Sequence, residues 1–336
     1  MARSRGTPGK PGRQAAGRQM TNQRTKLNRR IFVGAGVALA ATPAFTPAWA
    51  ADPRTGFTVP DGACDCHNHI YDPRFAYLPD AVLKPPYATV TDYRALQKRI
   101  GTSRSIVVQP STYGTDNRCT LDAVAQQGDA ARGVCVVNAS VSDAELKRLH
   151  AAGIRGVRIQ FGLGNPVPAE EVMPLAKRIA ALGWHIQCNM PPDLLVKMES
   201  LLMSLPVPVV VDHLGRATAL GQPQYDTVRR LLEKGHGWVK VSGAYLYGGG
   251  TAPDYAGATA AARGYIATAP ERCIWGSDWP HPDATKTVSP VAMPDDVVLI
   301  ALMKSWAPDE KLRHRILVEN PERLYGFDPK KRPKSS

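Results

Sequence analysis

The chain has 336 residues, of which 43% are hydrophobic and 21% are charged, and its formal net charge is +13. This length allows one large domain or two ordinary ones, and the composition is that of a globular protein with an ample core. The positive charge does not indicate a nucleic-acid partner, because residues 1–50 hold nine Lys/Arg and no Asp/Glu. The rest of the chain has 33 basic and 29 acidic residues, and four of those basic residues lie in the tail 329–336.

The segment 1–50 is predicted to be an export signal. An arginine pair at 29–30 precedes a modestly apolar run, and residues 48–50 fit an A-x-A cleavage site. The pair resembles a twin-arginine signal, so we expect the twin-arginine export machinery as a partner and a periplasmic or exported location. The alternative is an uncleaved anchor, but Pro43 and Pro47 interrupt the short run. We therefore expect no stable membrane insertion after processing.

Short apolar runs alternate with amphipathic stretches over residues 51–328. Eight runs are predicted to be strands, near 62–66, 105–109, 133–138, 156–160, 184–189, 207–212, 238–242 and 273–277. Helix-like segments separate them, as at 91–100, 120–127 and 170–181, and a capping-box pattern begins another at Ser142. This alternation favours a parallel sheet, and eight such units predict a single (β/α)8 TIM barrel followed by a basic tail. The six cysteines predict no disulfide and no thiol site, because four lie in apolar runs.

Polar residues end almost every predicted strand, on the side where a TIM barrel carries its active site. Burying such residues is costly unless they pair with each other or with a ligand. The set comprises His67, His69, Gln109, Ser111, Tyr113, Asn138, Arg158, Gln160, Asn189, Asp212, His213, Ser242, Tyr245, Tyr247 and Asp278. A ring of purely structural polar caps is the alternative interpretation.

The first strand ends in the histidine pair His67-x-His69. Strand alternation points both side chains to one side, where two imidazoles can hold a metal ion or polarise one substrate oxygen. An H-x-H pair alone is weak evidence, because such pairs occur by chance. The pair gains meaning only when His213 and Asp278 come from other strands to the same end of the barrel.

Six sequence pieces follow one another across roughly residues 58–327: Asp65–His69, Val108–Asn117, Gly153–Arg158, Asp212–Gly215, Trp275–His281 and Asn320–Tyr325. Together they resemble the amidohydrolase superfamily, in its branch of lactone-processing enzymes. The resemblance implies a hydrolase that opens a small carboxylated or sugar-acid lactone. His67, His69 and His213 would polarise the ring carbonyl. Asp278 would activate the attacking water and then protonate the leaving oxygen.

The resemblance also bears on metal binding. Metal-dependent relatives hold a divalent ion with the strand-one pair, a strand-five histidine and the strand-eight aspartate. Here the catalytic end of strand five carries Asn189, and His185 stands at the strand start. The lactone branch works without metal, so we expect no cofactor. If one divalent metal such as zinc is bound, its ligands would be His67, His69 and Asp278.

Arg158 is the predicted contact for a substrate carboxylate, because guanidinium and carboxylate groups match as a fork. A structural ion pair is the alternative. The predicted neutral contacts to the small-molecule substrate are Ser111, Tyr113, Tyr87 and Asn189. Relatives that act on a dicarboxylate carry further arginines, but the segments 161–164 and 243–250 have none. We therefore expect a monoanionic or neutral lactone.

Three other functions remain open at this stage. The same residues would support a lactone isomerase, in which a substrate hydroxyl replaces water. A metal-dependent amidohydrolase or decarboxylase would need a bound ion. An exported binding protein for sugar acids is a non-enzymatic alternative, but such proteins usually have two lobes and do not need an aspartate beside three histidines.

Overall fold

The computed structural model describes residues 55–161, 167–283 and 293–334. The predicted export signal at 1–50 therefore lies outside the described residues. Among the helices that are described, none is long and apolar enough to cross a membrane.

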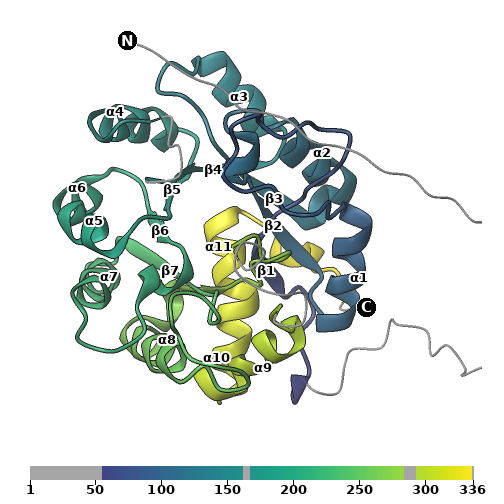
Figure 1. Ribbon diagram of the computed structural model, residues 1–336, viewed down its shortest axis with the longest axis vertical. Helices are drawn as coiled ribbons and strands as arrows, with labels where there is room; N and C mark the ends of the chain where they lie inside the picture. Colours follow the sequence, from purple (N-terminus) through teal and green to yellow (C-terminus); the bar gives the residue numbers. More distant parts are fainter. Residues whose placement is uncertain (1–54, 162–166, 284–292, 335–336) are drawn as a thin grey trace, which may run out of the picture. The chain divides into compact units, whose positions relative to one another are not determined.

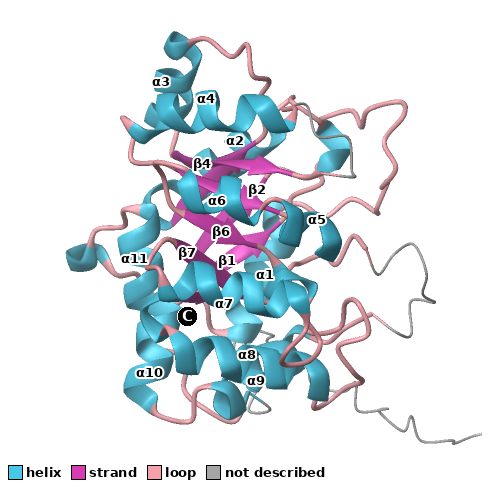
Figure 2. Cartoon of the chain, turned by 90° about the vertical axis from the view of Figure 1, so that its left-hand side faces the viewer, coloured by secondary structure: helices cyan, strands magenta, loops and turns pink. Residues whose placement is uncertain are grey.

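Eight parallel strands form one sheet, in which each strand pairs with the next along the chain. They are β1 (Cys64–Asn68), β2 (Arg104–Val108), β3 (Ala131–Cys135), β4 (Ile154–Ile159), β5 (His185–Cys188), β6 (Val209–Val211), β7 (Gly237–Val241) and β8 (Cys273–Trp275). Helices surround these strands in Figure 1, and Figure 2 shows the strands enclosed between helices from the side. The predicted TIM barrel is confirmed.

Helices alternate with the strands along the chain. They are α1 (Val90–Ile100), α2 (Arg118–Gln127), α3 (Asp143–Ala151), α4 (Ala169–Ala180), α5 (Pro192–Lys197), α6 (Glu199–Ser204), α7 (Pro223–Glu233), α8 (Ala256–Thr268), α9 (Asp296–Trp306), α10 (Glu310–His314) and α11 (Asn320–Tyr325). Local sequence sets their ends. Thr89 and Asp92 form a capping box at the start of α1, and Gly101 ends that helix with a left-handed φ of 80°. Ser142 caps α3, as its pattern predicts.

The barrel closes between β1 and β8 through side chains and single backbone contacts. The Asp65 carboxylate accepts hydrogen bonds from the Ser277 backbone N–H (2.9 Å), the Ser277 hydroxyl (2.6 Å) and the Tyr93 hydroxyl (3.0 Å). A Cβ at Gly276 would lie 2.6 Å from His67 Cβ, so this approach requires glycine. The seam thereby places the residues that follow β8 directly beside the histidines of β1.

Two apolar clusters support the barrel. The larger one packs the helices against the sheet, and the smaller one combines inward-facing strand residues with Tyr325 and Phe327. At the base of the barrel, Glu322 accepts hydrogen bonds from Arg104 (2.6 Å) and Arg332 (2.8 Å). Part of the predicted basic tail thus packs against the base of the barrel, at the end opposite to the strand termini that carry the candidate site.

Candidate active site

The Asp278 carboxylate lies at the meeting point of three histidines. Its Oδ1 is 3.5 Å from Nε2 of His67, 3.6 Å from Nε2 of His69 and 3.6 Å from Nε2 of His213. All four side chains are buried. The structure therefore brings together the four residues predicted to be catalytic, although they come from β1 and from the segments after β6 and β8.

Unusual backbone conformations present two of these side chains. Asp278 has a φ of 64° and His213 a φ of 48°, in the left-handed region that residues other than glycine rarely adopt. The Asp278 N–H donates to the His67 carbonyl at 2.8 Å, which anchors the strained residue to β1. His213 Nδ1 lies 3.0 Å from the Ser242 hydroxyl. Strain of this kind concentrates at functional sites, where the surroundings hold it in place.

Hydrogen bonds orient the two histidines of β1. A register shift between Asp65 and Asn68 interrupts the regular strand, yet both imidazoles still face the same site. His69 Nδ1 lies 2.7 Å from the Val108 carbonyl oxygen, and the Nε2 atoms of His67 and His69 are 3.3 Å apart. Because a carbonyl only accepts, His69 donates from Nδ1.

A buried charge network that the sequence analysis did not assign lies beneath the histidines. Lys240 of β7 is fully buried, and its Nζ donates to Gln187 Oε1 at 2.8 Å and lies 3.2 Å from His67 Nδ1. Asp212 Oδ2 accepts from Arg158 at 3.2 Å and from Gln187 at 3.1 Å. Burial is tolerable for these charges because each has an opposite charge within reach. In the sequence, the one signal for this network was Lys240, a lysine among the apolar residues of a predicted strand.

Burial and the charges around the site determine whether Asp278 and His67 are ionised. Burial alone raises the pKa of the Asp278 carboxyl, but His213, His69 and His67 outweigh burial and hold that pKa well below its usual range. Burial and the Lys240 ammonium group lower the pKa of His67 well below its usual value. An ionised carboxylate therefore faces a neutral His67 imidazole at physiological pH.

The second oxygen of Asp278 has its own partner, Tyr245, which the sequence places at the end of the seventh predicted strand without a specific role. The Tyr245 hydroxyl donates to Asp278 Oδ2 at 2.7 Å, and His281 Nδ1 lies 3.1 Å from the same hydroxyl. His281 Nε2 is 3.2 Å from Asp296 Oδ1. Burial lowers the pKa of His281, but the Asp296 carboxylate more than offsets this and raises it overall. The chain Asp296–His281–Tyr245 thus supports Asp278 from the side away from His67, His69 and His213.

A polar cavity opens above this centre. It is lined by His69, Tyr71, Leu83, Pro110, Ser111, Arg158, Gln160, Asn189, His213, Asp278, Pro282 and Asp283. Three predicted substrate contacts, Ser111, Arg158 and Asn189, therefore line it. Tyr113 is not among the lining residues, because it is buried with its hydroxyl accepting from the Asp72 N–H at 3.2 Å. Tyr87 is 59% exposed and is not a lining residue either.

Arg158 and Arg216 differ in how many of their guanidinium N–H groups already donate hydrogen bonds within the protein. Arg158 donates to Asp212 and to the Gln109 carbonyl, so the predicted alternative of a structural ion pair is present. Arg216, which sequence analysis did not select, donates to Asn189 Oδ1 at 2.9 Å and lies over the Tyr247 ring at 4.6 Å. Its Nε is buried without a hydrogen-bond partner among the described residues. Arg216 therefore has an unused donor beside a residue that lines the cavity.

Among the residues that the structure describes, two groups of side chains have the spacing of a metal site: His67 with His69 and Asp278, and His67 with Asp212 and His213. A metal-bound histidine normally donates its other ring N–H to an acceptor. His67 Nδ1 lies 3.2 Å from Lys240 Nζ and 3.3 Å from Asp212 Oδ1, and Arg158 Nη2 lies 3.4 Å from its Nε2. Lysine and arginine side chains only donate and are both positive. These two positive groups disfavour a divalent cation beside His67, whereas Asp212 is an acceptor of the kind that a metal-bound histidine uses.

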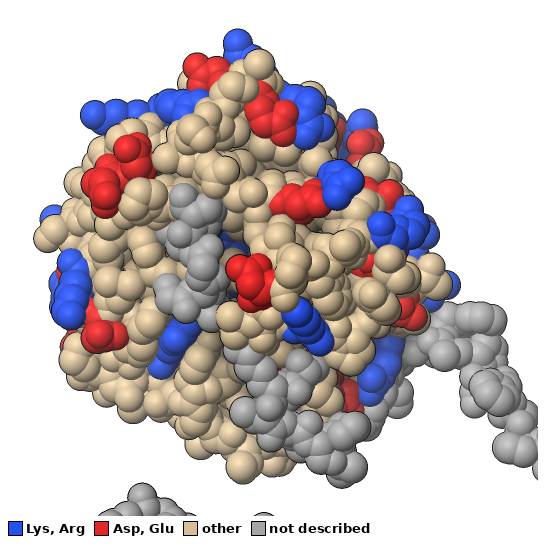
Figure 3. All heavy atoms as spheres, turned by 45° about the horizontal axis from the view of Figure 1, so that its top comes forward, with Lys and Arg blue, Asp and Glu red and all other residues tan. Residues whose placement is uncertain are grey.

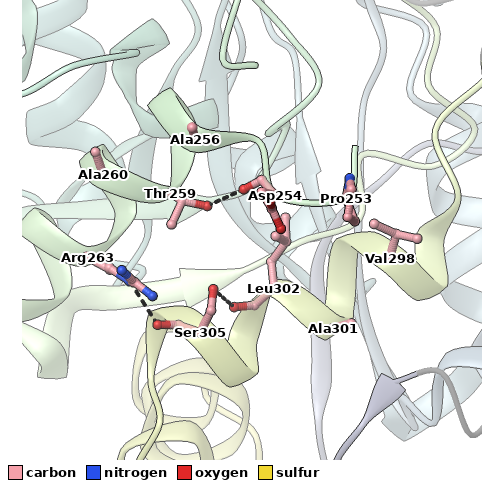
Figure 4. Close-up of a pocket in the computed structure, with 10 residues that line it drawn as sticks. All are labelled: Pro253, Asp254, Ala256, Thr259, Ala260, Arg263, Val298, Ala301, Leu302 and Ser305. Atoms are coloured by element: carbon pink, nitrogen blue, oxygen red, sulfur yellow. Dashed lines mark hydrogen bonds between the residues drawn. The ribbon is translucent and has the colours of Figure 1, made fainter. Parts of the chain in front are cut away.

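Two other surface features of the described residues differ from this site in character. A hollow of about 570 Å3 lies between α8 and α9 (Figure 4), where small apolar side chains such as Ala256, Ala260 and Ala301 line much of the wall. Basic and acidic side chains are interspersed on the face shown in Figure 3. That face offers no continuous basic surface of the kind that nucleic acids require.

Comparison with known proteins places the chain in a family. The model of the Amidohydrolase family matches residues 64–327. The chain belongs to this amidohydrolase family. A 2-pyrone-4,6-dicarboxylate hydrolase from Comamonas testosteroni is 36% identical over 293 residues, which cover 82% of this chain and 94% of that protein.

Two further relatives agree with this assignment. A D-galactarolactone isomerase from Agrobacterium fabrum is 34% identical and covers 81% of this chain and 94% of its own length. An apo crystal structure from Agrobacterium tumefaciens matches with a TM-score of 0.74 at 33% identity, over 82% of this chain and 99% of that one. The resemblance stated from the sequence is thus confirmed.

Proposed function

We propose that this amidohydrolase opens a lactone ring by hydrolysis and that it does so without a metal ion. The observation that carries the proposal is the placement of Asp278, whose Oδ1 faces three histidine Nε2 atoms while Oδ2 is held by Tyr245. An ionised carboxylate beside imidazole groups is suited to taking a proton from water next to a polarised carbonyl. The relatives named as a pyrone dicarboxylate hydrolase and a galactarolactone isomerase both have lactone substrates by name.

In the proposed reaction, Asp278 Oδ1 takes a proton from water as the water oxygen bonds to the lactone carbonyl carbon. The carbonyl electron pair moves onto its oxygen, and hydrogen bonds from His67 and His213 stabilise the resulting oxyanion. When the carbonyl re-forms, the ring C–O bond breaks. Asp278 then returns its proton to the leaving oxygen, which yields an open-chain hydroxy acid and restores the carboxylate.

Arg216 supports a substrate that carries one carboxylate. Its guanidinium group has an unused buried Nε, whereas Arg158 is engaged by Asp212. A carboxylate on the lactone would complete the hydrogen bonds of Arg216 in the bidentate way that guanidinium groups favour. Arg216 does not itself line the cavity but donates to Asn189, which does, and on this basis we propose a lactone with one carboxylate, including sugar-acid lactones.

Lactone isomerisation is the second candidate, and the similarity to the galactarolactone isomerase favours it. The steps are the same, except that a hydroxyl of the substrate replaces water as the nucleophile. Asp278 would then move a proton between two hydroxyls of one molecule. The two reactions differ in whether an oxygen atom from water enters the product.

A turnover experiment in 18O-labelled water tests the proposal and separates the two reactions. The purified, metal-stripped protein is incubated with 2-pyrone-4,6-dicarboxylate and with sugar-acid lactones that carry one carboxylate, and the products are identified by mass spectrometry. Hydrolysis predicts an open-chain acid that contains one 18O atom. A product with the mass of the lactone and no label would identify an isomerase. No turnover of any lactone would contradict the proposal.

We also propose that the enzyme reaches the periplasm or the exterior by the twin-arginine route. The support is the arginine pair and the A-x-A pattern within residues 1–50. The six cysteines are all buried with free thiols, which suits a protein that folds in a reducing compartment before export.

A further inference from the structure

We infer that Lys240 is a positioning residue that fixes the tautomer of His67. In this tautomer the ring proton is on Nε2, so His67 donates into the active site and has no Nε2 lone pair for a metal ion. Neither the family comparisons nor the sequence analysis assigned Lys240 to the site. A chain of hydrogen bonds runs from Lys240 through His67 and His69 to Val108. The direction in which each group donates indicates the role of Lys240.

The chain of hydrogen bonds is anchored at Val108. The carbonyl oxygen of Val108 is 2.7 Å from His69 Nδ1 and can only accept, so Nδ1 carries a proton. With the His69 ring taken as neutral, its Nε2 carries no proton and offers a lone pair to His67 Nε2 at 3.3 Å, with Asp278 Oδ1 farther away at 3.6 Å. His69 therefore presents an acceptor, and not a donor, to its neighbour His67.

The next link lies between the two rings. His67 Nε2 is 3.3 Å from His69 Nε2 and 3.5 Å from Asp278 Oδ1, and both partners are acceptors. Two lone pairs facing each other at this distance would repel, whereas an N–H of His67 would satisfy both neighbours. The proton of His67 therefore belongs on Nε2, which leaves a lone pair on Nδ1.

Lys240 is the group that matches this lone pair. Its Nζ is 3.2 Å from His67 Nδ1 with hydrogen-bond geometry, and it also donates to Gln187 Oε1 at 2.8 Å. Asp212 Oδ1 is 3.3 Å from the same Nδ1 and is the competing partner of this atom. Asp212 Oδ1 is also 3.5 Å from Nζ, which keeps the buried ammonium group paired with an opposite charge.

Arg158 offers the competing arrangement, because its Nη2 is 3.4 Å from His67 Nε2. A neutral imidazole accepts only one hydrogen bond in its ring plane. Nη2 also has the Asp212 carboxylate at 3.2 Å, so it keeps a partner when His67 donates from Nε2. When Lys240 donates to Nδ1 and His67 donates from Nε2, Lys240, His67 and Arg158 each have a suitable hydrogen-bond partner.

This tautomer divides the roles of the two histidines, and that consequence rests on the proposed function. His67 donates to the oxyanion that develops on the lactone carbonyl, whereas His69 accepts from His67 and orients it. Lys240 acts through His67 and does not line the cavity. Its removal should therefore affect the chemical step more than substrate binding.

Histidine-selective 15N labelling tests the tautomer directly, without a substrate. Long-range 1H–15N spectra of the full-length protein, with His67 assigned by its loss in His67→Gln, should show a neutral ring protonated on Nε2. A neutral ring with its proton on Nδ1, or a ring protonated on both nitrogens, would overturn the inference. Because this measurement needs no turnover, it is independent of whether the lactone proposal succeeds.

Lys240→Met supplies the second test, with Lys177→Met on the exposed face of α4 as the matched control. We expect Lys240→Met to move the His67 proton towards Nδ1, where Asp212 accepts it, and to lower kcat by about a hundredfold with KM retained. The control should leave both the spectrum and the kinetics unchanged. An unaltered His67 signal in a folded Lys240→Met protein would overturn the assignment.

Discussion

Tyr245 and Asp278 share a hydrogen bond of 2.7 Å that occupies the Oδ2 atom of the carboxylate. Oδ1 of the same carboxylate faces the three histidines. The two oxygens therefore have separate partners, which fixes the rotation of the carboxylate and directs its free electron pairs to the cavity. Catalysis depends on such preorganisation, because a base that must reorient loses part of its advantage.

Removing the Tyr245 hydroxyl tests this relationship. A hydrogen bond to a charged group is worth about 1.5–3 kcal/mol, so Tyr245→Phe should lower kcat by about 10- to 100-fold with little change in KM. The loss of a donor also raises the pKa of Asp278. Since the reaction needs the ionised carboxylate, the variant should lose activity at a higher pH than the wild type as the medium is acidified. Tyr225→Phe on α7 is the control, and an unchanged pH–rate profile in Tyr245→Phe would argue against the role.

The predicted carboxylate contact is tested at Arg216. Arg216→Gln should raise KM about 10- to 100-fold for a lactone with a carboxylate, because one charge-assisted pair is lost. A neutral lactone of the same ring should show no such change. Arg148→Gln, on the exposed surface of α3, serves as the control variant. An equal effect of Arg216→Gln on charged and neutral lactones would place the substrate carboxylate elsewhere.

Sequence alone predicts the barrel well, because short apolar runs and helix caps are local signals. The convergence of His67, His213 and Asp278 was also predictable, since the carboxyl ends of parallel strands meet at one face. Lys240 and Arg216 were not selected, because their roles depend on neighbours from other strands. Lys240 is a lone cation within an apolar run, and only the structure shows Gln187 and Asp212 beside it.

For two tyrosines, by contrast, the sequence predicts substrate contacts that the structure does not place in the cavity. Tyr113 follows β2 closely enough to suggest a substrate contact, but its ring packs inward against Tyr71, with ring centroids 6.1 Å apart. Tyr87 lies near α1 and stays exposed. Loop conformation decides where such side chains go, and a linear sequence does not encode it in a readable pattern. Tyr245, which follows β7 in a similar way, does reach Asp278.

The seam between β1 and β8 predicts a pH-dependent stability. Burial raises the pKa of Asp65 to about 6 from a usual value of 3.8, despite its hydrogen bonds. A carboxyl with a raised pKa stabilises the fold most below its unfolded-state pKa, and this contribution is lost as the pH rises through about 6.

Asp65→Asn removes this titration. The stability of the wild type relative to Asp65→Asn should therefore fall by about 3 kcal/mol between pH 4 and pH 7, as measured by urea unfolding. Asp80→Asn, at an exposed position, should show no such trend. A pH-independent difference between the wild type and Asp65→Asn would contradict the shifted pKa.

The proposed export route is tested by cell fractionation. Replacing Arg29 and Arg30 together with lysine should keep the protein in the cytoplasm at its precursor size, because the twin-arginine machinery reads the arginine pair. Lysine at Arg3 and Arg5 keeps the same charge and provides the control. Normal processing of the Arg29→Lys/Arg30→Lys protein would exclude this route.

The turnover of Asp278→Asn on the best substrate of the lactone panel tests the central claim most directly. The substitution keeps the size of the side chain and removes the proton acceptor. We expect kcat to fall by about 10²- to 10⁴-fold, with the unfolding temperature and KM close to those of the wild type. Full turnover by a folded Asp278→Asn protein would contradict the assignment of Asp278 as the base.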